Sequence, residues 1–206
     1  MTAILKVDTI QDTSGNNIIN ESSDTITIGA SGDTTNIVGT LQNNGSALIS
    51  GITEADQWRI NSNLTTSTAS GYFTANWERV DTDGFGKIGT GLTESSGVFT
   101  FPSTGVYLIA FDMMAYGNGG ARPYFGVRIA TTLDNSSYSD ASMTYASSYT
   151  NGAYGSMNGR FQFNVTDVST HKFKMGFETD GNSTIFENNS NRNSSNVTIT
   201  RLGDSV

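Results

Sequence analysis

Apolar and polar residues alternate along several short stretches of the chain after residue 50, and this pattern limits the fold more than any other feature. The apolar positions of these stretches are Phe125, Val127 and Ile129; Phe161, Phe163 and Val165; Phe173, Met175 and Phe177; and Val197 and Ile199. A period of two is typical of half-buried strands. The dipeptides between and around them, Asp83-Gly84, Asn118-Gly119, Asn151-Gly152, Asn158-Gly159 and Asp180-Gly181, favour hairpin turns. Residues 51–206 are therefore predicted to form an antiparallel sandwich or jelly roll of eight or more strands.

Two stretches depart from this alternation. Residues 53–61 are the one stretch for which we expect a short helix, because Ala55 and Trp58, together with Ile52 just before the stretch, lie near one helical face.

Residues 106–111 are apolar on both faces of a strand. Either a loop or the second sheet covers the outer face, or another subunit does. We favour the subunit, and assign the following residues to the core or to a subunit interface: Phe99, Val106, Tyr107, Leu108, Ile109 and Phe111.

The first 50 residues differ in composition from the rest of the chain, because every aromatic residue lies from Trp58 onward. Short β-branched runs alternate there with turn clusters about every ten residues. So few apolar residues cannot offset the ordering entropy of a single chain. The segment is therefore either an intertwined β-rich stem of parallel copies, which we favour, or a tail that becomes ordered only on docking. Residues 1–50 and 51–206 are predicted to be separate parts.

Charge and composition exclude several classes of function. A net charge of −8 opposes binding to nucleic acid, which depends on Lys and Arg. The longest apolar stretch, residues 106–111, is far shorter than the ~20 residues of a membrane-spanning helix. With no cysteine in the chain, a disulfide scaffold is also excluded. Residues 1–10 lack the pattern of a secretory signal, so we expect synthesis in a cytosol.

Candidates for catalysis and for metal binding are few. His171 is the single histidine, and we expect it to be a solvated residue at the start of a strand rather than a general base. The carboxylates Asp81, Asp83, Glu94, Asp140 and Asp180 lie in predicted turns, where turn chemistry explains them without a glycosidase pair. We predict that the protein is not an enzyme and has no cofactor. A polysaccharide depolymerase remains an alternative.

A tyrosine-rich stretch is the best candidate for recognition. Tyr with Ser, Asn and Gly is typical of binding surfaces, since the ring offers rigid contact area and a hydrogen-bonding tip. The alternative is that these residues pack inward in strands. The candidate receptor surface consists of Tyr138, Tyr145, Tyr149 and Tyr154, with Arg192 in a second, polar loop.

Residues 99–111 resemble the signature of the C1q/TNF-like jelly roll, F-x5-G-x-Y-x-F-x-[FY]. Phe99, Gly105, Tyr107 and Phe111 match it, while Ile109 replaces an aromatic residue. Upstream, Leu92 also matches, but Lys87 and Asp81 do not. The resemblance implies a jelly-roll head over residues 55–206 that assembles as a tight homotrimer. Calcium at the trimer apex is possible by family analogy, although no residue here is assigned to it.

Residues 4–19, Ile-Leu-Lys-Val-Asp-Thr-Ile-Gln-Asp-Thr-Ser-Gly-Asn-Asn-Ile-Ile, are similar to the openings of tail-fibre and other virion proteins of marine bacteriophages, including cyanophages. That resemblance implies a β-rich stem before a C1q-like head, and release by lysis of the host. Its apolar positions Ile4, Val7, Ile10, Ile18 and Ile19 become candidates for anchoring to other virion proteins.

The sequence therefore predicts an all-β virion protein, a homotrimeric fibre whose head adheres to a host-surface glycan or protein. One alternative is a capsid or tail decoration protein that cements the particle and binds no receptor. The other is the depolymerase.

Overall fold

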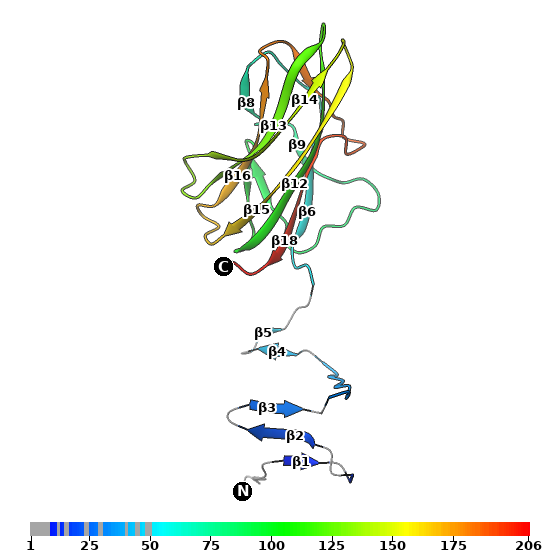
Figure 1. Cartoon of the computed structure of the whole chain (residues 1–206), viewed down its shortest axis with the longest axis vertical. Helices are drawn as coiled ribbons and strands as arrows, with labels where there is room; N and C mark the ends of the chain where they lie inside the picture. Colours follow the sequence, from blue (N-terminus) through cyan, green and yellow to red (C-terminus); the bar gives the residue numbers. More distant parts are fainter. Residues whose placement is uncertain are drawn as a thin grey trace. The chain divides into compact units, whose positions relative to one another are not determined.

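The computed structural model describes residues 51–206 throughout and, before them, residues 9–11, 13–14, 17–22, 25–28, 31–39, 41–43 and 46–47. The chain divides into two compact units, Met1–Ser50 and Gly51–Val206. All the regular elements in these ranges are strands (Figure 1). The described residues accordingly contain no helix long and apolar enough to span a membrane. The prediction of an all-β fold is confirmed.

The first unit contains two small antiparallel sheets (Figure 1). Strands β1 (Thr9–Gln11), β2 (Asn17–Ser22) and β3 (Thr25–Ile28) form one, and β4 (Gln42–Asn43) pairs with β5 (Ser46–Ala47) in the other. Ile10 is the register partner of Ile19, and Ile19 is the partner of Ile28, so the three side chains form one row across the sheet. Each is between 37% and 56% exposed. Of the other predicted anchoring residues, Ile4, Val7 and the side chain of Ile18 lie outside the described residues.

The second unit, called the head below, is a sandwich of two antiparallel sheets. The β13 sheet has the order β10-β11-β16-β13-β14, with β8 also paired to β16; the β12 sheet has the order β7-β17-β12-β18-β6-β9, with β15 also paired to β12. The strands are β6 (Ala55–Ile60), β7 (Leu64–Thr66), β8 (Ser70–Tyr72), β9 (Trp77–Arg79), β10 (Thr93–Ser95), β11 (Val98–Thr100), β12 (Gly105–Gly117), β13 (Arg122–Thr132), β14 (Ser139–Ser148), β15 (Tyr154–Val165), β16 (Lys172–Thr179), β17 (Thr184–Phe186) and β18 (Asn196–Gly203).

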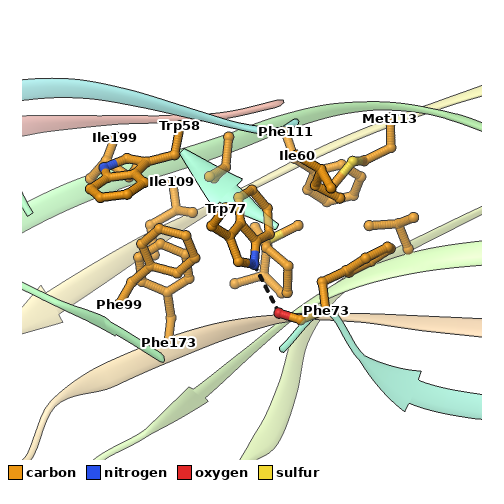
Figure 2. Close-up of a cluster of buried hydrophobic side chains, with 14 of the residues drawn as sticks. Trp58, Ile60, Phe73, Trp77, Phe99, Ile109, Phe111, Met113, Phe173 and Ile199 are labelled. Carbon is orange, nitrogen blue, oxygen red and sulfur yellow. Dashed lines mark hydrogen bonds between the residues drawn. The ribbon is translucent and has the colours of Figure 1, made fainter. Parts of the chain in front are cut away.

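An aromatic core fills the space between the two sheets (Figure 2). The rings of Phe99 and Phe173 stack with centroids 4.7 Å apart, and Trp58 and Trp77 approach Phe99 edge-on. The indole Nε1 of Trp77 donates a hydrogen bond of 2.8 Å to the carbonyl oxygen of Phe73, so this buried polar atom is satisfied. Offset and edge-to-face rings are the arrangements that aromatic quadrupoles favour.

The helix predicted over residues 53–61 is wrong, because Ala55–Ile60 is strand β6. Trp58 and Ile60 point into the core as alternation requires, but the third inward position is Asp56, which is 3% exposed. Its carboxylate accepts hydrogen bonds from the Trp58 indole, the Leu92 amide and the Arg79 guanidinium. The alternation of β6 was missed because its inward position 56 is a charged residue, Asp56, and not an apolar one.

Two smaller expectations also fail. His171 is 9% exposed and its ring stacks on Phe163 at 5.7 Å, so it is buried rather than solvated. The predicted turn at Asn158-Gly159 lies inside β15. The other four dipeptides do lie in loops, where Gly84, Gly119, Gly152 and Gly181 have φ values between +73° and +89°, a region that favours glycine. Each of these loops connects strands of different sheets, so they are turns but not the predicted hairpins.

Candidate functional site

Strand β12 separates the predicted core and interface residues into two faces. Its inward side chains, Tyr107, Ile109 and Phe111, are at most 1% exposed, and Phe99 on β11 is fully buried. These four side chains belong to the interior of one subunit. Val106 and Leu108 lie on the opposite, outer face and are half-buried. The predicted subunit interface therefore depends on these two residues and their neighbours.

The outer face of the β12 sheet around Leu108 is built of small and polar residues. Register places Leu108 between Thr200 of β18 and Gln162 of β15, and places Ala110 between Thr198 and Arg160. Leu108 and Arg160 also line a hollow of about 620 Å³ with Phe161 and Gln162. Leu108 and the hollow beside it together offer half-buried apolar surface that a second copy of the chain can pack against.

The candidate receptor residues lie in several places. Tyr149 is 89% exposed in the loop after β14, and Tyr154 packs edge-on against Tyr116 with centroids 5.0 Å apart on the β12 sheet. Arg192 forms an ion pair of 3.1 Å with Glu187 in the loop before β18. Tyr138 and Tyr145 belong instead to one continuous group on the outer face of the β13 sheet.

We call this group the outer tyrosine patch. It is a chain of contacting side chains contributed by four strands and the segment before β14: Tyr138, Lys174, Tyr72, Arg128, Glu178, Tyr145 and Tyr124. Four aromatic rings, two cations and one carboxylate are thereby gathered on one face, with Asp140 beside Arg128. Such a combination is suited to binding a polar ligand with flat apolar faces.

One end of the outer tyrosine patch carries a cation between two rings. The Lys174 ammonium lies 4.1 Å from the ring centroid of Tyr138 and 5.3 Å from that of Tyr72, and the two rings are 6.4 Å apart. A cation over an aromatic face is attracted by the ring quadrupole. Burial, the largest cause, raises the pKa of the Tyr138 phenol, so this hydroxyl is a hydrogen-bond donor at neutral pH.

A buried arginine holds the centre of the outer tyrosine patch. Arg128 is 6% exposed, and its guanidinium donates to the carbonyl oxygen of Phe177 at 2.9 Å. Asp140 lies 3.0 Å from its Nε and Glu178 lies 3.6 Å from one of its terminal nitrogens. The Nε atom has no hydrogen-bond partner among the described residues, so the Asp140 carboxylate is close to Nε but outside the line of its N–H.

The other end of the outer tyrosine patch is acidic. The Tyr145 hydroxyl donates a hydrogen bond of 2.7 Å to Glu178, and its ring meets that of Tyr124 edge-on at 5.9 Å. These three residues line a hollow of about 380 Å³. The hydrogen bond to Glu178 is the largest cause that raises the pKa of the Tyr145 phenol. The Glu178 carboxylate keeps further lone pairs that can accept hydroxyl donors of a ligand.

The sequence analysis identified only Tyr138 and Tyr145 of this patch. Two glycines within strands could have indicated that large side chains, Tyr145 and Arg128, lie over them. Gly126 and Gly176 face outward in strands, where glycine is otherwise unfavourable. A Cβ at Gly126 would meet the Tyr145 ring at 2.6 Å, and one at Gly176 would meet Arg128 at 2.8 Å. The two glycines let these large side chains lie flat on the sheet.

Three of the five carboxylates considered for hydrolysis are each held by a different arginine. Asp81 pairs with Arg59, Asp140 with Arg128, and Asp180 approaches Arg122 to 4.0 Å. In the part of the chain that the structure describes, no three His, Cys, Asp or Glu side chains gather closely enough to hold a metal ion. The outer tyrosine patch, by contrast, combines aromatic rings with hydrogen-bond donors and acceptors.

Comparison with solved structures identifies the fold of the head. The structure of Eiger TNF from S. frugiperda has a TM-score of 0.54 at 14% identity and matches 74% of this chain and 94% of its own. Murine APRIL at pH 5.0 has a TM-score of 0.52 at 11% identity and matches 72% of this chain and 98% of its own. The head is a TNF-like jelly roll. No family model and no curated protein matches the sequence.

The TNF-like jelly roll confirms the fold predicted from residues 99–111. Phe99 of the motif lies on β11, while Gly105, Tyr107 and Phe111 lie on β12. The Tyr107 hydroxyl donates a hydrogen bond of 3.0 Å to the carbonyl oxygen of Ser103, while its ring is buried against Phe101. In this TNF-like head, the outer tyrosine patch occupies the outer face of the β13 sheet, and Val106 and Leu108 occupy the outer face of the β12 sheet.

Proposed function

We propose that the chain is a homotrimeric virion structural protein of a bacteriophage, whose first 50 residues bind other virion proteins and whose head adheres to a host-surface glycan. The observation that carries the proposal is the outer tyrosine patch. It holds four tyrosine rings and a half-buried lysine on a rigid sheet, backed by a buried arginine. Sites on rigid elements lose little freedom on binding. The virion setting is supported by the resemblance of residues 4–19.

Trimer formation is supported by the outer face of the β12 sheet. Val106 and Leu108 remain half-buried in one subunit, next to the hollow lined by Leu108, Arg160 and Phe161. A second copy that covers Leu108 would remove apolar surface from water, which stabilises association by about 25 cal/mol per Å² of apolar area before the costs of binding. The outer tyrosine patch lies on the other sheet and stays free in such an assembly.

The stem assignment is supported by the isoleucine row of the first unit. Ile10, Ile19 and Ile28 line up across β1, β2 and β3 and stay exposed in a single chain. Exposed apolar rows of this kind are covered when copies of a chain share a core or when a partner binds. Anchoring of this segment to the particle is consistent with the same row.

Adhesion by such a protein works through multiple weak contacts. Three heads on one trimer offer three outer tyrosine patches, and a virion carries many trimers. Once one patch is bound, the others bind at a high effective concentration, so avidity exceeds the affinity of one site by a factor of about 10² to 10⁴. The net charge of −8 per chain keeps the protein soluble and opposes non-specific adsorption to anionic surfaces.

A glycan array probed with the purified full-length chain tests the proposal. Discrete binding to a set of glycans, together with a mass near three times 21.9 kDa by light scattering, is the expected result. Shortened polysaccharide chains in the same incubation would identify a depolymerase instead. A trimer that binds no glycan and that coats particles or tails would identify a cementing protein.

A further inference from the structure

The Lys174 ammonium is the one cation of the outer tyrosine patch without an acidic partner. Within residues 51–206, no carboxylate lies within ion-pair distance of it and no hydrogen bond is formed by it. Only the rings of Tyr72 and Tyr138 contact the charge. An ammonium has three N–H donors, and ring faces satisfy none of them as strongly as a carboxylate does. The donors on the open side of Lys174 are therefore available to an anion.

Arg128 differs from Lys174 because carboxylates of the same chain already pair with its positive charge. Asp140 and Glu178 both lie within ion-pair distance of its guanidinium. The central region therefore carries one buried cation and two carboxylates, an excess of one negative charge. Lys174 carries one positive charge at the Tyr72 and Tyr138 end, where the Asp134 carboxylate is within electrostatic range of the Tyr138 phenol but forms no ion pair with Lys174. The outer tyrosine patch is thus polarised along its length, with a cationic end and an acidic end.

We propose that the outer tyrosine patch binds an acidic glycan, with a uronate carboxylate at Lys174 and the hydroxyls of a neighbouring sugar at Glu178. The apolar face of a sugar ring stacks on Tyr72 or Tyr138, which flank the ammonium. The neighbouring ring occupies the hollow of about 380 Å³ lined by Tyr124, Tyr145 and Glu178. This inference deepens the proposed adhesion and rests on it.

The polarity of the outer tyrosine patch selects this ligand over the alternatives. A neutral glycan leaves the Lys174 donors unpaired beneath it, which costs free energy once water is excluded. A polyanion without hydroxyls, such as polyphosphate, places negative charge against Glu178 and Asp140 and offers no donor to the Glu178 carboxylate. A sugar chain that presents both a carboxylate and free hydroxyls matches both ends. Because the chain carries a net charge of −8, each site is weak and the three sites of a trimer act together.

The test compares glycans that differ only in their carboxylates. Polygalacturonate and its methyl ester are immobilised, with hyaluronan as a second uronate polymer and dextran as a neutral one, and binding of the full-length chain is measured by surface plasmon resonance. We expect binding to the uronate polymers and at least tenfold weaker binding to the methyl ester, since a hydrogen bond to a charged group contributes about 1.5–3 kcal/mol and 1.4 kcal/mol is a factor of ten.

Two matched substitutions identify the residue responsible. K174M removes the charge and keeps the length of the side chain, and we expect it to weaken binding to polygalacturonate about tenfold or more. K87M removes the same charge from the loop that bridges to β6 in the other sheet, and we expect affinity close to wild type. Y138A removes the ring that lies nearest to Lys174 and is expected to weaken binding as well.

Several outcomes would overturn the inference, and they separate it from the proposed function. Equal affinity for polygalacturonate and its methyl ester, or equal losses in K174M and K87M, would show that no carboxylate is recognised at Lys174. If the chain binds dextran or other neutral glycans alone, adhesion stands and the acidic ligand is wrong. If a trimer binds no glycan at all on these surfaces or on the array, both proposals fail.

Discussion

The ring of Phe111 on β12 packs directly over Gly159 on the neighbouring strand β15. The two residues are register partners, and a Cβ placed at Gly159 would lie 2.6 Å from the Phe111 ring. Phe111 is 1% exposed, so the ring has no room to move away. Gly159 is therefore required by close packing inside a strand. The sequence context Asn158-Gly159 instead suggested a hairpin turn.

Replacing Gly159 by alanine should destabilise the head. Overpacking a dense core costs about 1–3 kcal/mol. Chemical denaturation of the full-length chain measures the change. Gly203→Ala is the matched control, because Gly203 also lies in a strand and a Cβ there meets no atom within 4 Å. Equal stability of the two variants would contradict the packing explanation.

Much of the head could be predicted from the alternation of its apolar residues. The strands around Phe125, Phe163, Phe173 and Val197 are β13, β15, β16 and β18, because one face of each is apolar and packs inward. Strand β6 escaped prediction because Asp56 occupies an inward position, where it pairs with Arg79. Alternation reports hydrophobicity, and a buried charge on the inward face removes that signal.

The outer tyrosine patch could be predicted only in part, for a reason of topology. Tyr72 lies on β8 and Tyr145 on β14, and the patch becomes continuous only when β16 and β13 pair between them. Antiparallel pairing sets which side chains become neighbours, and the sequence does not state the strand order. Tyr138 and Tyr145 were found because tyrosine is concentrated near them. Lys174 appeared simply as the polar residue between Phe173 and Met175.

Tyr107 should contribute to stability in two separable ways. Tyr107→Ala removes a fully buried ring and should cost about 3–5 kcal/mol. Tyr107→Phe keeps the ring and removes the hydroxyl that donates to the Ser103 carbonyl oxygen, which should cost about 0.5–1.5 kcal/mol. Denaturation midpoints of both variants give the comparison. An unchanged midpoint for Tyr107→Ala would be incompatible with burial of the ring.

Asp134 should make the stability of the head depend on pH in the acidic range. Its carboxylate accepts hydrogen bonds from the amides of Ser137 and Ser136 and from the Thr132 hydroxyl, and the Ser137 amide is the largest cause that lowers the Asp134 pKa in the folded state. A lowered pKa contributes stability above the unfolded-state pKa of about 3.9, and this contribution is lost as the pH falls below that value. Asp134→Asn should therefore lower the melting temperature at pH 7.

The pH profile separates this effect from a general loss of structure. The difference in melting temperature between wild type and Asp134→Asn should shrink steadily as the pH falls below about 3.9, because the unfolded chain then binds a proton at Asp134 that the folded state does not yet bind. Asp83→Asn removes the same charge from an exposed loop and serves as the control for net charge. A difference that stays constant from pH 7 to pH 3 would contradict the role of the Asp134 charge.

Leu108 should determine the oligomeric state without determining the fold. Its side chain lies on the outer face of β12, so Leu108→Glu places a charge where we propose that a second copy packs, while the core behind Tyr107 and Ile109 stays intact. Burying a charge at an interface costs desolvation free energy, even with Arg160 nearby as a counter-charge. Light scattering should show wild type near three times 21.9 kDa and the variant near 21.9 kDa, with an unchanged circular dichroism spectrum.

Tyr124→Glu adds the same charge to the outer face of the β13 sheet and should leave the trimer intact. A trimeric Leu108→Glu variant would move the interface elsewhere, and a monomeric wild-type chain would remove the basis for adhesion by three linked heads.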